Sequence, residues 1–162
     1  MRNWERVKVV IIGVARQGIA LARYLVSHGA QVTLNDKRPL EDLVEAKSSL
    51  QDLEHLGRTI TWVCGNHPSE ILDGVDLVCV SGGVSLDLPL IQEAQRRGIP
   101  LSNDSQIFLD EAPCRVIGIT GSAGKTTTTT LLGRMASAAV SDMSERPVYR
   151  KAWVGGNIGS PL

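Results

Sequence analysis

The chain has 162 residues, which at roughly 100–200 residues per domain allows one domain, or one domain and part of a second. Hydrophobic residues make up 43% of the sequence and charged residues 21%, a composition that excludes wholesale disorder. The 17 basic and 17 acidic side chains cancel, so the basic excess typical of nucleic-acid binders is missing. Because only 4% of the residues are aromatic, the core must consist of Val, Ile, Leu and Ala, which is typical of a parallel sheet covered by helices.

Cysteine usage and hydropathy indicate the compartment. Cys64, Cys79 and Cys114 are an odd number without CxxC spacing, which argues against a disulfide framework and a zinc site. No apolar run approaches the ~18–20 residues of a membrane span, and residues 1–6 lack the apolar stretch of a secretory signal. We therefore expect a cytoplasmic protein that binds neither membrane nor nucleic acid. We also expect it to be a monomer.

The first elements form a repeat of strand, helix and strand. Residues 7–12 (VKVVII) are an apolar, β-branched run that predicts a buried strand. Apolar residues recur at helical spacing over residues 17–28, and Gly29 follows where a helix C-cap belongs. Residues 31–34 (QVTL) predict a second strand. Such a unit of about 30 residues predicts parallel strands joined by a right-handed crossover.

The alternation of helices and strands continues after this unit. In chain order, the pattern predicts an amphipathic helix at 40–56, strands at 59–64 and 75–80, a helix at 88–97, a short strand at 99–102, and a short helix that Asp104 caps and that reaches Leu109. The fold class is therefore α/β, with a Rossmann-like parallel sheet over residues 1–112.

A domain boundary is predicted at residues 111–113 (EAP). After it the pattern predicts a strand at 115–119, a glycine-containing loop at 120–124 and a helix at 125–139. A polar loop at 141–151 and a brief strand at 152–154 are predicted to follow. We expect residues 113–162 to be the beginning of a P-loop ATPase domain. This second domain is expected to be incomplete, because 50 residues are too few for an α/β domain.

The loop before the second domain's helix carries a phosphate-binding motif. Residues 120–127 read TGSAGKTT, between a predicted strand and a predicted helix. Small residues let successive backbone N–H groups converge on phosphate oxygens, while Lys125 would reach the β- and γ-phosphates and Thr126 would hold Mg²⁺. The strict GxxxxGK[ST] pattern would have glycine at position 119, where the chain has Ile119. The alternative is an ordinary strand–turn–helix with a solvated lysine.

A second glycine turn follows the first strand. Residues 13–18 (GVARQG) resemble GxGxxG, with Ala15 in place of the middle glycine. Gly13 would permit the tight turn, and Gly18 would permit close packing of helix on strand. The motif alone is weak evidence, because a Rossmann-type turn can exist without a ligand.

Polar residues around this turn are candidates for a nucleotide site. Backbone N–H groups near Arg16 and Gln17 could receive a pyrophosphate. Asp36 ends the second strand, where an acidic residue usually meets the ribose or base. Lys37 and Arg38 could cover a base or neutralise a phosphate, or could be plain surface charges.

Other motifs give weaker signals. The turn at residues 81–83 (SGG) follows a buried strand, at the edge where open α/β sheets bind ligands. Cys79 is expected in the core rather than as a nucleophile. The histidines lack metal-ligand spacing and are expected on the surface or in turns: His28, His55 and His67.

With these motifs in tandem, nearly the whole chain resembles the Mur ligases, ATP-dependent enzymes of bacterial peptidoglycan precursor synthesis. The resemblance rests on the segments VVIIGVARQGIALARYL, LNDKRP, SGGVSLDLPLIQEAQRRGIPLSNDSQIFL, VIGITGSAGKTTTTTLL and VGGNIGSPL. The TGxxGK[ST] loop is a strong marker of this family, which typically lacks the glycine missing at position 119. Ala15, Gly82 and Ala123 depart from the residues usual in the family.

The resemblance implies a role for each matching residue. The first domain would bind the UDP part of the substrate, with Arg16 and Gln17 at the diphosphate, Gly83 along the nucleotide and Asn157 near the muramoyl-peptide end. Asp36, Lys37 and Arg38 would surround the uracil. The ATP loop would comprise Gly121, Ser122, Ala123, Gly124, Lys125, Thr126 and Thr127, with Thr126 on Mg²⁺.

The resemblance also implies an acid–amino-acid ligase reaction. The substrate carboxylate would attack the γ-phosphate of ATP to give an acyl phosphate, from which the amine of D-glutamate would then displace phosphate. The GGNIG motif and the length of the first domain favour the branch that adds D-glutamate to UDP-N-acetylmuramoyl-L-alanine. The threonine run after Lys125 also resembles the sister branch that adds L-alanine. The family's remaining metal ligands and its amino-acid domain match nothing in these residues, so we expect no ligase turnover from this chain alone.

Two further functions remain open from the sequence. An oxidoreductase or an NAD-sensing regulatory module could use the first glycine turn, but this interpretation leaves the TGSAGKTT loop unexplained. A regulatory or carrier P-loop ATPase could use its first domain only to bind a partner. The latter predicts ATP binding without affinity for uridine nucleotides.

Overall fold

The computed structural model describes residues 2–55, 57–58, 60–142 and 151–156, without the side chains of 54, 55, 141 and 142. The chain divides into two compact units, Met1–Pro113 and Cys114–Pro161. We refer to them as the first and second units and describe each by itself.

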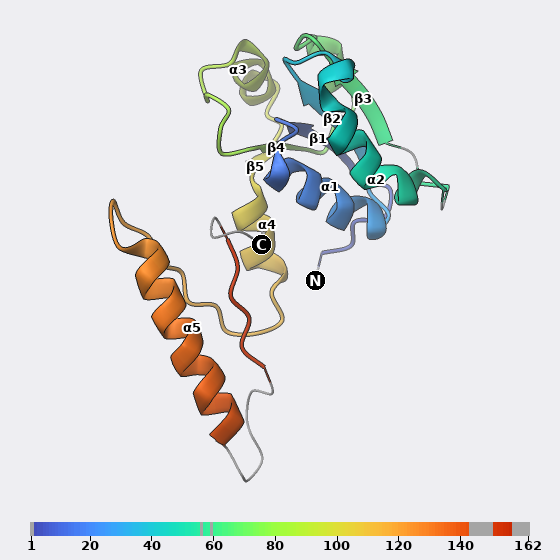
Figure 1. The fold of residues 1–162 in the computed structure, drawn as a ribbon. Coiled ribbons are helices and arrows are strands. Elements are labelled where there is room, and N and C mark those ends of the chain that lie inside the picture. Colours follow the sequence, from blue (N-terminus) through green and yellow to red (C-terminus); the bar gives the residue numbers. More distant parts are fainter. Residues whose placement is uncertain (1, 56, 59, 143–150, 157–162) are drawn as a thin grey trace. The chain divides into compact units, whose positions relative to one another are not determined.

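The first unit is built on a five-stranded parallel sheet (Figure 1). Its strands are β1 (Lys8–Ile12), β2 (Gln31–Asp36), β3 (Ile60–Cys64), β4 (Leu77–Val80) and β5 (Leu101–Ser102). The order across the sheet is β3-β2-β1-β4-β5, so the direction of winding reverses between β1 and β4. In open parallel sheets, ligands bind outside the carboxyl ends of the strands at such a reversal. The predicted α/β fold with parallel strands is confirmed.

Helices cover both faces of this sheet. They are α1 (Arg16–Ser27), α2 (Val44–His55), α3 (Pro89–Arg96) and α4 (Asp104–Glu111), with short 3₁₀ helices η1 (Leu40–Leu43) and η2 (Ser69–Leu72). Because side chains alternate along a strand, Val9 and Ile11 of β1 pack with α1, α2 and α4, while Val10 and Ile12 pack with α3 and η2. Figure 1 shows α1 and α2 on one side of the sheet and α3 on the other. The two apolar cores fix β1 and β4 in the centre.

The structure corrects two details of the predicted helices. Residues 40–55 form η1 followed by α2 rather than one helix. The α4 helix is capped by Asn103, whose side chain accepts a 2.8 Å hydrogen bond from the Gln106 amide. An N-cap residue typically has an extended backbone, and its side chain accepts a hydrogen bond from the amide of the second or third helical residue. Asn103 meets both conditions, whereas Asp104 is already in the first turn.

A buried carboxylate joins the end of α4 to the start of the chain. Glu111 accepts hydrogen bonds from the Arg2 amide at 3.0 and 3.2 Å and from the indole Nε1 of Trp4 at 3.2 Å. Trp4 is 3% exposed and Glu111 9% exposed. The carboxylate therefore satisfies an indole N–H that has been removed from water.

We expect Glu111→Ala to lower the free energy of unfolding by about 1–3 kcal/mol, because the buried Trp4 indole N–H would lose its acceptor. Urea denaturation followed by tryptophan fluorescence measures this loss. Glu111→Gln keeps an acceptor oxygen and should cost less. Equal losses for the two variants would contradict the role assigned to the indole hydrogen bond.

The second unit differs from its prediction in two segments. The apolar run at 115–119 is not a strand, because no described segment of this unit pairs with it; Val116 and Ile117 are 39% and 70% exposed. Residues 152–154 are likewise not a strand, although Val154 lies against α5 (Lys125–Asp142). A Cβ on Gly133 would be 2.5 Å from Cγ2 of Val154.

The remaining predictions for this unit concern its helix and its polar loop. The predicted helix is confirmed as α5, which continues three residues beyond the predicted end at 139. Most of the predicted loop at 141–151 lies outside the described residues. Among the described helices of the chain, none is both long and apolar enough to cross a bilayer.

Candidate nucleotide sites

The first glycine turn leaves β1 at the reversal of the sheet. Gly13 has φ of +96°, and a Cβ there would lie 2.8 Å from Val84 Cγ2 and 2.9 Å from Cβ of Ser81. The Ser81 hydroxyl donates a 2.7 Å hydrogen bond to the Gly13 carbonyl. The predicted turn at 81–83 therefore packs directly on the glycine turn, and only glycine fits at position 13.

The second glycine of the motif lets α1 approach this turn. A Cβ on Gly18 would lie 2.2 Å from the Gly13 carbonyl oxygen, far inside van der Waals contact. Ala15 is extended, with φ of −101° and ψ of −174°, so the missing middle glycine causes no backbone strain. These contacts confirm the predicted roles of Gly13 and Gly18.

The start of α1 presents features of an anion site. The helix begins at Arg16, its first turn contains no acidic residue, and the side chain of Ala15 makes no capping hydrogen bond. First-turn N–H groups and the positive end of the helix dipole attract phosphate oxygens. Arg16 and Gln17 lie in this first turn, and the exposed Gly83 follows β4 at the same sheet edge.

Asp36 ends β2 beside this turn, and its carboxylate is fully used within the protein. The residue is 6% exposed. Its Oδ2 accepts from the Val14 amide and from Arg38 Nη2, both at 2.8 Å, and its Oδ1 accepts from Arg38 N and Nε, both at 3.0 Å. A carboxylate offers about four lone-pair positions, so these four hydrogen bonds occupy them.

The same contacts set the protonation of Asp36. Burial alone would raise its pKa, but hydrogen bonds from Arg38 and from the Val14 amide outweigh burial and hold the pKa well below its usual range. The carboxylate is therefore ionised throughout the neutral range. It fixes Arg38, whose Nη2 also donates a 2.9 Å hydrogen bond to the Val14 carbonyl, against the glycine turn.

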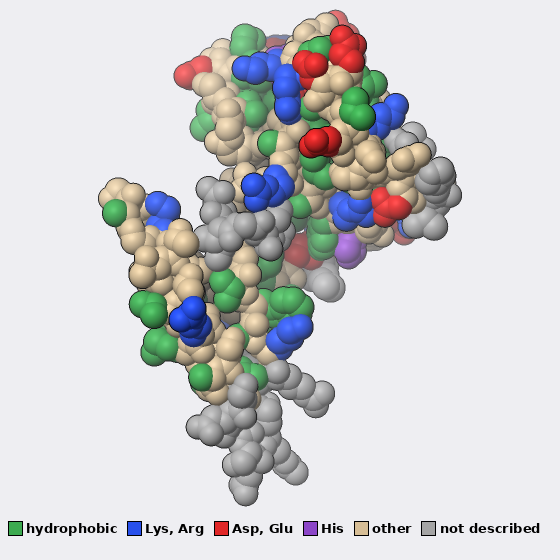
Figure 2. Space-filling view, in the orientation of Figure 1, with side chains coloured by type: hydrophobic (Ala, Val, Ile, Leu, Met, Phe, Trp, Pro, Cys, Tyr) green, Lys and Arg blue, Asp and Glu red, His purple; other side chains and the backbone are tan. Residues whose placement is uncertain are grey.

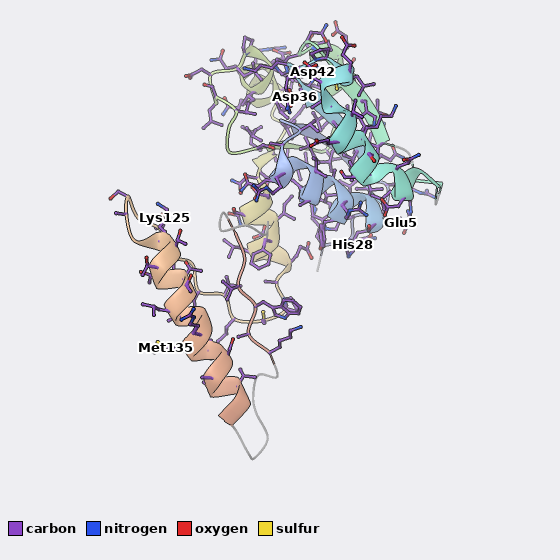
Figure 3. The ribbon with its side chains drawn as sticks, viewed as in Figure 1. Glu5, His28, Asp36, Asp42, Lys125 and Met135 are labelled. Carbon is purple, nitrogen blue, oxygen red and sulfur yellow. The ribbon has the colours of Figure 1, made fainter. Side chains whose placement is uncertain are left out.

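Figure 3 shows where Asp36 lies within the first unit. Asp36 and Asp42 lie at one end of this unit, and His28 and Glu5 lie at the other. Asp36, Lys37 and Arg38 leave β2 together, as the sequence predicts. Lys37 is exposed, and 44% of the Arg38 side chain is exposed, so both cations border solvent at the carboxyl end of β2.

The phosphate-loop motif lies in the second unit. The loop curls through Gly121 and Gly124, which have φ of +149° and +76°, before α5 begins at Lys125. The Lys125 ammonium folds back and donates to the Gly121 carbonyl. All side chains from 121 to 127 are exposed, and Thr126 occupies the first turn of α5. Backbone N–H groups in such a loop can bind a chain of phosphates.

The charged side chains that the structure describes in the unit of this loop are basic. Among the side chains described in the second unit, no acidic group occurs, and the charged ones are Arg115, Lys125, Arg134 and Lys151. Figure 2 shows blue and green side chains on the surface of this unit. Asn157, the remaining predicted residue, lies outside the described residues.

A family model described as Mur ligase MurD-like, N-terminal domain, matches residues 7–103, which include all five strands and the glycine turn. The chain belongs to this family.

Curated relatives of this MurD-like chain are UDP-N-acetylmuramoylalanine–D-glutamate ligases. That of Syntrophotalea carbinolica is 35% identical over 162 residues, covering 100% of this chain and 33% of the relative. That of Geobacillus kaustophilus is 41% identical over 138 residues, covering 85% of this chain and 29% of the relative. The chain therefore spans about a third of the length of these relatives.

Solved structures show the same fold. UDP-N-acetylmuramate-alanine ligase MurC from Thermotoga maritima matches with 25% identity and a TM-score of 0.51, over 78% of this chain and 28% of that one. A ligase from Neisseria meningitides that acts on UDP-N-acetylmuramate and a tripeptide has a TM-score of 0.57 at 19% identity, over 83% of this chain and 40% of that one. At that identity the second match supports the fold alone.

Two residues that sequence reasoning missed lie at the carboxyl ends of the strands in this MurD-like domain. Asn35 is fully buried, and its Nδ2 donates to the carbonyls of Val63 at 2.7 Å and Asn66 at 2.9 Å. Its Oδ1 lies 2.5 Å from Nδ1 of His67, which is partly buried rather than a plain surface residue. The signal that could have found Asn35 is an amide inside an apolar strand, because buried polar groups must be paired.

Two cavities in the described part of the chain lie away from the predicted nucleotide-binding residues. One of about 370 Å³ lies at the amino ends of the strands, beside Lys8, Gln31 and Asp73. Another of about 250 Å³ lies between α1 and α4, beside Tyr24 and Phe108. Neither is lined by a residue that the sequence predicts to bind nucleotide.

Proposed function

We propose that this chain is part of an ATP-dependent ligase that joins D-glutamate to UDP-N-acetylmuramoyl-L-alanine in peptidoglycan precursor synthesis. Two glycine turns, each at the start of a helix and each suited to phosphate, support the proposal. The names of the relatives support the choice of D-glutamate over L-alanine. The pattern of free cysteines supports a cytoplasmic location.

In this proposal the first unit binds the UDP part of the substrate. The first turn of α1, with Arg16 and Gln17, receives the diphosphate, and Gly83 lines the nucleotide. Lys37 and Arg38 border the uracil, while Asp36 fixes Arg38 instead of contacting the ligand. Asn157 is proposed to approach the muramoyl-peptide end of the substrate.

The second unit is proposed to hold the phosphates of ATP in the loop of residues 121–127. The curled backbone, the exposed loop and the basic side chains described in this unit support binding of a polyphosphate, and Thr126 is proposed to hold Mg²⁺. Bound Mg²⁺ would neutralise charge on the β- and γ-phosphates. Lys125 would leave the Gly121 carbonyl and stabilise the charge that develops as the substrate carboxylate attacks the γ-phosphate and ADP leaves. The amine of D-glutamate would then displace phosphate from the resulting acyl phosphate.

The hydrogen bonds of Asp36 disfavour an oxidoreductase. A site for a nicotinamide dinucleotide needs an acidic side chain that can accept from the ribose hydroxyls. All four acceptor positions of Asp36 are taken by Arg38 and the Val14 amide. Ribose could bind there only by displacing one of these donors.

Titration calorimetry with paired variants tests the proposal. We expect the chain to bind both UDP-N-acetylmuramoyl-L-alanine and Mg–ATP, and not NADH. Lys125→Ala should weaken ATP binding by about 10- to 100-fold through loss of charge-assisted hydrogen bonds, and leave the UDP-substrate affinity unchanged. Arg38→Ala should weaken binding of the UDP substrate and leave the ATP affinity unchanged.

Lys151→Ala is the matched control for the lysine. Lys151 lies over the exposed Trp153 ring, 3.6 Å from its centroid, and belongs to no predicted site. Its removal should leave both affinities unchanged. Binding of NADH, or of ATP without any uridine nucleotide, would overturn the proposal in favour of one of the alternatives.

A further inference from the structure

The loop after β3 is tied to the end of β2 by main-chain and side-chain hydrogen bonds. The Gly65 amide donates to the carbonyls of Asp36 at 3.0 Å and Arg38 at 2.9 Å, from a φ of +91°. The Asn35 side chain holds the neighbouring carbonyls of Val63 and Asn66. The 65–67 segment therefore lies against the 36–38 segment, which carries the two cations proposed to border the uracil, Lys37 and Arg38.

Asn35 also reaches the glycine turn. Its carbonyl accepts a 2.8 Å hydrogen bond from the Gly13 amide. One fully buried residue thus connects the turn proposed for the diphosphate with the loop after β3, and it directly precedes the 36–38 segment proposed to border the base. Its last polar atom, Oδ1, lies against His67.

The chemistry of Asn35 fixes the proton on His67. Val63 and Asn66 offer carbonyl oxygens, which can only accept, so the Asn35 nitrogen must face them with both hydrogens. Oδ1 can then only accept, and Nδ1 of His67, 2.5 Å away, must donate. The ring is therefore held in the Nδ1–H form, which no feature of the sequence indicates.

We infer that His67 is a positioning residue of the proposed uridine site, which through Asn35 holds the 65–67 loop and the 36–38 segment in their binding geometry. The inference rests on the proposed function. Without the imidazole, Oδ1 of Asn35 would be a buried acceptor without its donor, and of the side-chain hydrogen bonds between Asn35 and the loop only those to the carbonyls of Val63 and Asn66 would remain. His67 acts through its neighbours and needs no contact with the ligand.

The test measures UDP affinity of the 162-residue chain by calorimetry. His67→Ala should weaken UDP binding by about tenfold, because one buried hydrogen bond that shapes the site is lost. His67→Asn places an amide N–H where Nδ1 lies and should restore most of that affinity. His28→Ala is the matched control, since His28 lies exposed at the other end of the first unit (Figure 3), and it should bind like the unmodified chain.

A second readout reports the hydrogen bond directly. Nitrogen-15 NMR of the ligand-free chain should show His67 protonated on Nδ1. A ring protonated on Nε2 alone would overturn the inference whatever the affinities. Thermal melting identifies a His67→Ala chain that fails to fold, in which case His67→Asn and the NMR signature decide.

The remaining outcomes separate the two proposals. If the unmodified chain binds UDP and His67→Ala binds equally well, the inference fails and the proposed function stands. If His67→Asn folds and is as weak as His67→Ala, a positioning role is wrong. If the unmodified chain binds no UDP, the proposed function fails, and the inference that rests on it fails too.

Discussion

Gly18→Ala is expected to destabilise the first unit by about 3 kcal/mol or more, the upper range for overpacking a rigid site. The new Cβ would lie 2.2 Å from the Gly13 carbonyl oxygen, which is main chain and cannot rotate away. Gly13 in turn is held by Asn35 and Ser81. Relief therefore requires α1 to move off the sheet, and urea denaturation followed by circular dichroism would measure the loss.

Gly83→Ala is the control for this substitution. A Cβ on Gly83 would meet no atom within 4 Å, and the residue is not among the glycines of positive φ. Its free energy of unfolding should stay within about 0.5 kcal/mol of the unmodified chain. A Gly18→Ala chain as stable as Gly83→Ala would contradict the close approach of α1 to the glycine turn. UDP binding should also be lost in Gly18→Ala, because the first turn of α1 would no longer face the sheet edge.

Asp36→Asn is expected to cost about 2–4 kcal/mol at pH 7, because removing one partner of a largely buried ion pair leaves the other uncompensated. The 8% exposed carboxylate side chain pairs with Arg38, whose side chain is 44% exposed, which keeps the cost below that of a fully buried pair. An amide also turns an N–H group toward donors that need an acceptor. Urea denaturation of the two chains measures the difference.

The pH dependence of this difference has a definite sign. Folding depresses the pKa of Asp36 well below its usual range, so the carboxylate stabilises the protein above its unfolded pKa of about 3.9. That stabilisation is lost as the pH falls below this value toward the folded pKa. The gap between the unmodified chain and Asp36→Asn should therefore be constant from pH 7 to about pH 5 and shrink below about pH 4. A gap that stays constant to pH 2.5 would contradict the assignment.

Asp52→Asn is the matched control for the carboxylate. The hydrogen bond from Arg23 also lowers the pKa of Asp52, but this pair lies on the surface, with side chains 43% and 60% exposed. Water and salt screen such a pair. Asp52→Asn should therefore have a much smaller effect than Asp36→Asn.

Local signals in the sequence determined most of the first unit. The β-branched run before Gly13, the helical spacing after it and the glycines that end α1 and α3 each depend on nearby residues only. The roles of Gly13 and Gly18 were also predictable, because a tight strand–turn–helix requires residues without a side chain at those places.

Tertiary structure decided the rest. Asp36 has the right type and place for a ligand contact, yet its oxygens are consumed by Arg38 and by an amide 22 residues earlier. Asn35 and His67 are 32 residues apart, and no spacing rule connects them. The apolar run at 115–119 shows the converse, since a strand exists only when another segment supplies its hydrogen bonds. The sequence by itself therefore determined which residues of the first unit form turns, helices and strands. The tertiary structure decided which polar atoms remain free to contact a ligand, because hydrogen bonding of these atoms depends on which segments the parallel strands bring together.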